Sequence, residues 1–141
     1  MARIMTTDER ERFLAEERVG VLSVTAEYGR APLAVPIWYL YEPGGEIRFI
    51  TGGQSRKMRL VRAAGRVTVT VQEERPPYRY VTVEGDVTGY EEPADPADRQ
   101  AVARRYLGED GAAAYLASTE HLADAAVLVR VRPQRWLSRA V

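Results

Sequence analysis

The sequence predicts an α+β fold in which one antiparallel sheet closes toward a small barrel. Six segments rich in β-branched residues are separated by turn signals, largely at hairpin spacing, and helical patterns are inserted beside them. A chain of 141 residues with 45% hydrophobic and 28% charged residues suits one globular domain. We therefore take residues 1–141 as a single domain.

The expected elements are, in order, a helix over residues 7–17, strands over 19–25, 32–41 and 46–51, a helix over 54–64, strands over 67–71 and 78–90, helices over 93–107 and 109–118, and a last strand over 126–132. Thr7 is the expected cap of the first helix, and Gly29 the tip of the first hairpin. Proline cannot donate a hydrogen bond to a neighbouring strand, so Pro36 predicts an edge, a bulge, or a backbone that faces something other than a neighbouring strand.

Glycine and proline punctuate the second half of the chain. Gly52 and Gly53 end the third strand, and the valines of residues 67–71 alternate cleanly with polar residues. Pro76 and Pro77 force a loop before residues 78–90, which we expect to be the longest strand. Pro133 is expected to end the last one.

Charge and composition exclude several classes of protein. Twenty basic and twenty acidic side chains balance to zero, which argues against binding nucleic acid by bulk attraction. Without cysteine, and with His121 as the single histidine, we expect neither thiolate catalysis nor a metal site. No apolar run reaches the ~18–20 residues of a membrane span, and the charged N-terminus is unlike a signal peptide. We therefore expect a soluble, cytoplasmic protein that does not bind membranes.

Residues 49–59 are the segment most suggestive of chemistry. A strand ends in two glycines and a helix begins near Ser55, with Arg56 and Lys57 in its first turn. Unpaired N–H groups at a helix start favour a phosphate, and both side chains add positive charge. A capped helix with a solvated basic face explains the same pattern, and composition alone favours that interpretation. Lys57 is the only lysine among the 20 basic residues.

Aromatic residues are the second suggestive feature. They are Trp38, Tyr39 and Tyr41 on one expected strand and Tyr78 and Tyr80 on another. Flat aromatic walls beside a phosphate site suit a planar ring with a phosphorylated tail. Aromatic residues also pair across strands in any barrel, so this feature does not decide the function alone.

The order of several segments in the middle of the chain joins these features. They are residues 48–51, the run Ser55-Arg-Lys57, residues 65–71, and residues 74–78 with 81–85. Their order and spacing resemble the pyridoxamine 5'-phosphate oxidase-like split-barrel family of FMN- and deazaflavin-binding oxidoreductases. The resemblance spans residues 18–90. The Ser-Arg-Lys run is its most specific part, whereas the valine-rich strands are unspecific.

The resemblance implies a six-stranded antiparallel split barrel with flanking helices, which forms a homodimer with two cofactor sites at the interface. The implied cofactor-binding residues are Arg56, Lys57, Ser55, Thr51, Pro36, Ile37, Trp38, Gln72 and Tyr78. The first four would hold the phosphate of coenzyme F420 or FMN, the next three would line the ring, and the last two would approach it, with the partner subunit as one possible source. The implied activity is hydride transfer to a small conjugated substrate.

Departures from the family pattern argue against oxidation of pyridoxamine phosphate itself. Val35 and Leu40 stand where the oxidases carry a strand arginine and a lysine, and Tyr80 stands where they offer a glutamine to the flavin. The C-terminal Arg-x-His element is missing from residues 132–136. The short chain and the loop over 73–78 look more like the branch that uses F420.

The sequence does not identify a catalytic side chain. Hydride transfer needs no nucleophile, and Tyr39, Tyr78 and Tyr80 are the candidate proton donors. A protein that binds or carries a flavin without turnover is the alternative, and a purely structural role would leave Pro36 and Ser55-Arg-Lys57 unexplained. FMN and F420 both stay open, with Arg59 and Arg62 available for the acidic tail of F420.

Overall fold

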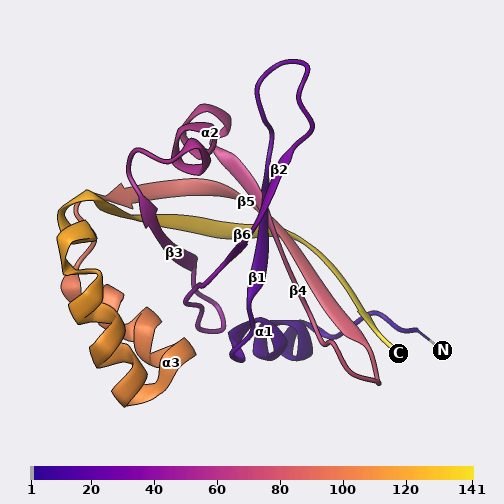
Figure 1. The fold of residues 1–141 in the computed structure, drawn as a ribbon. Coiled ribbons are helices and arrows are strands. Elements are labelled where there is room, and N and C mark those ends of the chain that lie inside the picture. The colour runs from indigo at the N-terminus through magenta and orange to yellow at the C-terminus, as the bar shows by residue number, and fades with distance from the viewer. Residues whose placement is uncertain (1) are drawn as a thin grey trace.

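Six antiparallel strands form one strongly curled sheet in the computed structural model, which describes residues 2–141 (Figure 1). The elements are α1 (Thr7–Ala15), β1 (Gly20–Val24), β2 (Leu33–Ile37), β3 (Ile47–Gly52), α2 (Arg56–Ala64), β4 (Arg66–Gln72), β5 (Arg79–Glu91), α3 (Pro96–Ser118), the 3₁₀ helix η1 (Glu120–Ala125) and β6 (Ala126–Ala140). The strand order is β2-β1-β4-β5-β6-β3. The sheet curls into a half-barrel with helices at its sides, which confirms the predicted α+β fold.

The inside of the curl is filled by alternate residues of the strands. Val67, Val69 and Val71 of β4 are all at least 98% buried, while the threonines between them face outward. Ile47 and Phe49 of β3 are buried in the same core, as the alternation in the sequence predicts. Burial of these side chains is the main stabilising contribution to the barrel.

Strand β2 lies at the edge of the sheet and pairs only with β1. Pro36 faces Val21 across this pair, so the prediction of an edge position is confirmed. The strand ends at Ile37 rather than residue 41, because the next backbone groups leave the ladder. The Tyr39 N–H donates to the Tyr106 hydroxyl at 3.1 Å, and Leu40 forms an isolated bridge with Arg48.

Both short helices begin at hydroxyl caps. Thr6, not Thr7, caps α1, because its side chain accepts from the Glu9 N–H while the Glu9 carboxylate accepts from the Thr6 N–H. Ser55 caps α2 by accepting from the Met58 N–H at 3.1 Å. Helix α2 ends at Gly65, whose φ of 68° is readily adopted only by glycine.

The longest strand is β6, with 15 residues against 13 in β5, so the prediction for residues 78–90 is wrong on that point. The strand continues through Pro133 because Pro133 lies opposite Gly85 at a β-bulge, where the ladder is already interrupted. Strand β6 pairs with β3 over residues 126–131 and with β5 over residues 128–140.

Helix α3 contains the break that the sequence predicts between residues 107 and 109. Gly108 has φ 73° and ψ 177°, so the helix changes direction there. The hydroxyl of Tyr106, two residues earlier, donates to the Arg18 carbonyl at 2.8 Å and fixes the helix beside the end of β2. Within residues 2–141, no helix combines the length and the apolar character needed to cross a membrane.

Candidate functional site

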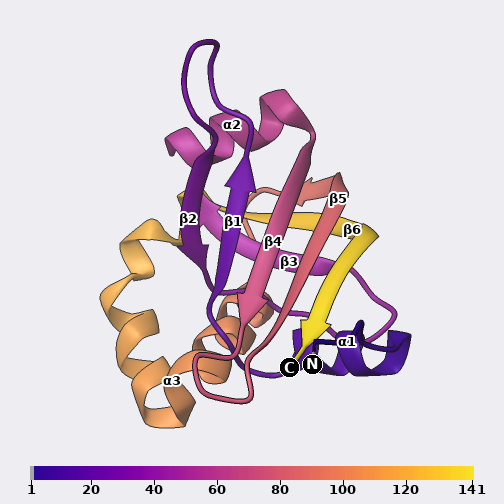
Figure 2. The ribbon, with the colours of Figure 1, turned by 90° about the vertical axis from the view of Figure 1, so that its right-hand side faces the viewer.

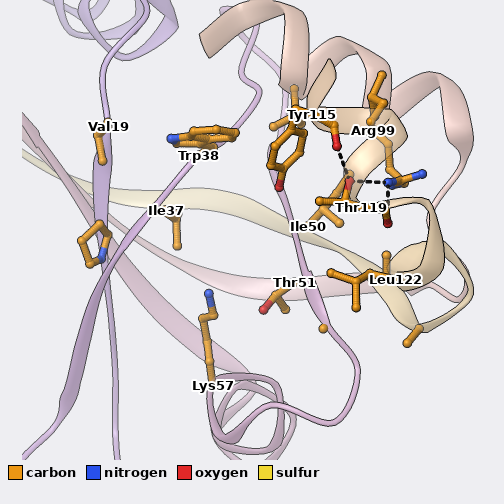
Figure 3. A pocket seen from close by; sticks show the side chains of 16 residues that line it. Val19, Ile37, Trp38, Ile50, Thr51, Lys57, Arg99, Tyr115, Thr119 and Leu122 are labelled. Carbon is orange, nitrogen blue, oxygen red and sulfur yellow. Dashed lines mark hydrogen bonds between the residues drawn. The ribbon is translucent and has the colours of Figure 1, made fainter. Parts of the chain in front are cut away.

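A cavity of about 440 Å³ lies where the ends of β2 and β3 meet α2, α3 and η1 (Figure 3). Its lining residues are Val19, Pro36, Ile37, Trp38, Ile50, Thr51, Gly52, Lys57, Arg99, Val102, Tyr115, Leu116, Thr119, Leu122, Ala125 and Ala126. The volume is in the usual range for a small-molecule site. Most of the lining is apolar, and charged side chains come only from Lys57 and Arg99.

Lys57 extends from α2 into this cavity toward β2 (Figure 3). Its side chain is half-buried, and burial lowers the pKa of its amine below the usual value of 10.5. No carboxylate of residues 2–141 forms an ion pair with it, so nothing in this part of the chain offsets the loss of water. The amine of Lys57 is therefore a cation in the cavity without a counter-charge from residues 2–141, and a bound anion would stabilise it.

Residues 48–66 form a basic stretch, with six basic side chains and no acidic one, and its cations other than Lys57 are all paired. The pairs are Arg48 with Glu42 and Asp98, Arg56 and Arg59 with Glu27, Arg62 with Glu92, and Arg66 with Asp86. Every carboxylate in these pairs comes from outside the basic stretch. The local positive charge that the sequence shows is therefore neutralised by the fold everywhere except at Lys57.

Arg56 and Lys57 face different surroundings although they are adjacent. Arg56 is turned to the β1–β2 hairpin, where its Nη2 lies 2.6 Å from the Glu27 carboxylate, and it does not line the cavity. Ser55 also stays outside the lining, since its hydroxyl caps α2 and donates to the Gly52 carbonyl at 2.9 Å. Thr51 is 91% buried and lines the cavity next to Gly52.

Trp38 forms an aromatic wall together with residues of α3. Its ring stacks on Tyr106 with a centroid distance of 5.1 Å and an interplanar angle of 7°. Tyr115 lies tilted against the same ring at 5.6 Å. The sequence indicates Trp38 but not its two partners, because they come from a helix about 70 residues later.

The tyrosines that follow Trp38 do not face the cavity. Tyr39 is fully buried, and its hydroxyl donates to the Leu14 carbonyl at 2.6 Å. Burial raises the pKa of Tyr39. Tyr41 is also in the core, and its hydroxyl donates to Glu11. Tyr39 is thus removed from the candidate proton donors.

The far wall of the cavity comes from the α3–η1 segment, which the sequence does not mark as functional. Tyr115, Thr119 and Leu122 of this segment line the cavity (Figure 3). Arg99 stabilises the junction by donating to the Thr119 hydroxyl at 3.2 Å, and its guanidinium points away from Lys57. The apolar residues that follow Gly108 were the available signal, but their direction depends on the break in the helix.

Gln72 and Tyr78 lie outside the cavity. Gln72 lines a neighbouring hollow of about 480 Å³ on the outer side of the sheet, which shares Val19 and Pro36 with the first cavity. Tyr78 is 55% exposed in the β4–β5 loop and lines neither hollow. Of the nine predicted binding residues, the cavity gathers Pro36, Ile37, Trp38, Thr51 and Lys57.

Comparisons with known proteins agree with this fold. A protein named F420 reductase matches with a TM-score of 0.72 and 23% identity, over 90% of this chain and 94% of its own. A conserved hypothetical protein from Mycobacterium tuberculosis matches with a TM-score of 0.76 and 24% identity, over 97% and 86%. A FAD-binding protein from Mesorhizobium loti matches with a TM-score of 0.68 and 26% identity, over 100% and 99%.

Among curated proteins, no sequence matches the chain significantly. The sequence profile described as pyridoxamine 5'-phosphate oxidase matches residues 6–140, which is nearly the whole chain. The half-barrel, the helix start at Ser55 and the cavity beside it lie within this match. The chain therefore belongs to the pyridoxamine 5'-phosphate oxidase family of split-barrel proteins.

Proposed function

We propose that the protein is an oxidoreductase that binds FMN or coenzyme F420 by its phosphate at the start of α2 and transfers hydride to a small conjugated substrate. The observation that carries the proposal is Lys57. It is the only lysine of the chain, and it is half-buried in an apolar cavity without a carboxylate partner among residues 2–141. A phosphate would provide the missing counter-charge.

The residues around Lys57 fit such a group. The first turn of α2 contains no acidic residue, so the partial positive charge of its N-terminus is not offset within the helix. Thr51 offers a hydroxyl beside Gly52, and Ile37 and Trp38 offer an apolar wall. In this proposal Lys57, Arg56, Ser55 and Thr51 hold the phosphate, and Pro36, Ile37 and Trp38 border the ring.

The bound cofactor would supply the hydride chemistry, and the protein would supply orientation and exclude water. The stacked pair of Trp38 and Tyr106 gives a rigid wall that cannot easily move aside. Among the residues that line the cavity, Thr51, Tyr115 and Thr119 carry hydroxyl groups for a proton that the substrate needs. An apolar lining favours a conjugated, weakly polar acceptor.

Two observations bear on the choice between the cofactors. A protein with the same fold is named F420 reductase, and another is named FAD-binding. Arg59 and Arg62, which the sequence offers for an acidic tail, are paired with Glu27 and Glu92. An acidic tail would therefore have to compete with these carboxylates, so we keep both FMN and F420 in the proposal.

A homodimer is the second part of the proposal. The outer face of the sheet is not crossed by a helix in front of β1, β4 and β5 (Figure 2). An uncharged row crosses five strands on this face, consisting of Pro36, Val21, Thr70, Thr82 and Leu137. Val21 and Leu137 are 41% and 48% exposed. A partner on this row would cover the hollow of Gln72 and bring its own loop residue Tyr78 near a cofactor site.

The test is to purify the protein, record any bound chromophore, and titrate FMN and F420 by fluorescence. We expect one of them to bind, and the double variant Arg56→Ala/Lys57→Ala to lose binding while it stays folded. Arg62→Ala is the matched control for FMN, which has no acidic tail, since it removes a cation from the same helix but not from the cavity. Equal binding by the double variant would overturn the proposal.

The alternative function is a flavin carrier without turnover, favoured by the low number of polar groups in the cavity. It predicts that the bound cofactor is neither oxidised nor reduced across a panel of quinones, enones and nitroaromatics.

A further inference from the structure

A single carboxylate pairs with two arginines of α2 beside the cavity. Glu27, in the β1–β2 connection, accepts from Arg56 Nη2 at 2.6 Å and from Arg56 Nε at 3.3 Å. It also accepts from Arg59 Nη2 at 3.3 Å. Both arginines belong to α2, so the hairpin supplies the negative charge that the helix itself lacks.

This arrangement separates the two cations that the sequence places together. Lys57 points into the cavity without a partner, whereas the planar fork of Arg56 is occupied by Glu27. An anion that arrives at Lys57 meets a guanidinium one residue away that is already bound. The anion and Glu27 are therefore competitors for Arg56.

We propose that Glu27 is the residue that sets the phosphate affinity of this site: a bound phosphate displaces Glu27 from Arg56 and thereby releases the β1–β2 hairpin from α2. The inference rests on the proposed function, because it requires that a phosphate bind at the start of α2. It adds a specificity-determining residue outside the cavity lining.

The Arg56–Glu27 pair is suited to such an exchange. Its side chains are 33% and 42% exposed, so water screens the pair and replaces part of its hydrogen bonding when it opens. The phosphate of FMN carries more negative charge at neutral pH than one carboxylate, so it attracts Arg56 more strongly. The hydrogen bond from Arg56 lowers the pKa of Glu27 to about 2, so Glu27 stays ionised and the competition does not change near neutral pH.

The exchange also changes how firmly the hairpin is attached to α2. The coupling is reciprocal. The free energy by which the Glu27 contacts weaken phosphate binding equals the free energy by which bound phosphate weakens the attachment of the hairpin to α2. The hairpin projects beyond the sheet beside α2 (Figure 1), and Tyr28 near its tip is fully exposed. Loss of the Glu27 contacts would therefore leave residues 25–31 freer to open.

The test compares FMN with riboflavin, which differs only by the phosphate, in fluorescence titrations of the wild type and Glu27→Gln. If F420 is the cofactor, the pair is deazariboflavin 5'-phosphate and deazariboflavin, which likewise differ only by the phosphate. We expect Glu27→Gln to bind the phosphorylated compound about two- to fivefold more tightly, as for loss of one exposed competing charge. Binding of the phosphate-free compound should not change.

Glu92→Gln is the matched control, because Glu92 pairs with Arg62 at the other end of α2. Neither compound of a pair carries an acidic tail that could reach Arg62, so this variant should leave both affinities unchanged. A second readout is amide hydrogen exchange of residues 25–31, which FMN should accelerate in the wild type but not in Glu27→Gln, where the hairpin is already released.

If Glu27 only stabilised the fold, Glu27→Gln should lower the affinity for both compounds, because a loosened fold would bind each of them more weakly. Weaker or unchanged FMN binding by Glu27→Gln, with a wild type that binds FMN, overturns this inference and leaves the proposed function standing. A wild type that binds neither FMN nor F420 overturns the proposed function, and the inference with it.

Discussion

Lys57 is half-buried with no ionic partner among residues 2–141, although burial works against its charge. Sequence reasoning singles out Lys57 because it is the only lysine, and the structure places it in the cavity. The direction of Arg56 was not predictable, because it depends on Glu27, which lies 29 residues earlier. Neighbours on a helix point about 100° apart, so Arg56 can join Lys57 at a phosphate only by leaving Glu27.

Lys57→Met should make the cofactor-free protein more stable and unable to bind the cofactor phosphate. The folded state lowers the Lys57 pKa, so the unfolded chain binds the extra proton between the lowered value and 10.5, and wild-type stability rises with pH in that window. Below the window the buried charge destabilises the fold, and methionine removes it. Thermal unfolding at pH 7 should show a higher midpoint. Arg62→Met, which breaks a pair, should not raise it.

Cofactor affinity should fall as the pH rises, and the fall should begin at a lower pH than it would if the phosphate were held by an exposed lysine. The phosphate needs the protonated amine, and burial lowers the pKa of Lys57 below its usual range. Lys57→Arg keeps its charge, so its affinity should stay flat over the same interval. Fluorescence titrations of FMN from neutral pH to about pH 10 measure both curves. Parallel curves for the two proteins would mean that Lys57 does not hold the phosphate.

Gly85→Ala should destabilise the barrel by about 2 kcal/mol or more. A Cβ at this position would meet the backbone of Arg132, with its carbonyl carbon 2.9 Å away, and backbone cannot move aside cheaply. Gly89→Ala is the control on the same strand, because its Cβ would meet nothing within 4 Å. Urea unfolding of the two variants gives the comparison, and equal midpoints would contradict this account of the bulge.

At the scale of elements, the order of helices and strands followed from the sequence, but the ends of several did not. The sequence predicts the break in α3, because a change of helical pattern and Gly108 coincide. The continuation of β6 beyond Pro133 was not predictable, because it depends on Gly85 of another strand. The cavity wall from Tyr115 to Leu122 was missed for the same reason, since only tertiary packing directs it toward Trp38.

Tyr106→Phe should loosen α3 from the barrel. The Tyr106 hydroxyl donates to the Arg18 carbonyl at 2.8 Å and accepts from the Tyr39 N–H at 3.1 Å, so its removal leaves two partly buried groups without a partner. We expect a loss of about 1–3 kcal/mol in the free energy of unfolding. Tyr115→Phe is the control, because its hydroxyl forms no hydrogen bond within residues 2–141, and its stability should be nearly that of the wild type.

At the scale of the whole molecule, the sheet buries a core on one side and leaves the uncharged row on the other. Alternation along β4 and β5 predicts both faces, since valines point inward and threonines outward. Thr70 and Thr82 lie opposite each other and share a hydrogen bond of 3.1 Å. An uncharged row over five strands, with Val21 and Leu137 exposed in it, favours an interface over a solvated sheet.

Val21→Arg should convert a dimer into a monomer, because it places a charge within the uncharged row of each subunit, which association would have to bury. Val21 points outward at 41% exposure, so the substitution leaves the core of the monomer intact. Light scattering should give twice the chain mass of 15.8 kDa for the wild type and the chain mass for the variant. Tyr28→Arg, at the fully exposed hairpin, should keep the wild-type mass.

The cofactor affinity of the Val21→Arg variant shows whether the partner subunit contributes to the cofactor site. If the hollow of Gln72 is covered by a partner, Val21→Arg should weaken FMN or F420 binding although Lys57 and the cavity wall are untouched. A folded monomer with wild-type affinity would show that one chain builds the whole site. A wild type that is already monomeric would exclude the interface altogether.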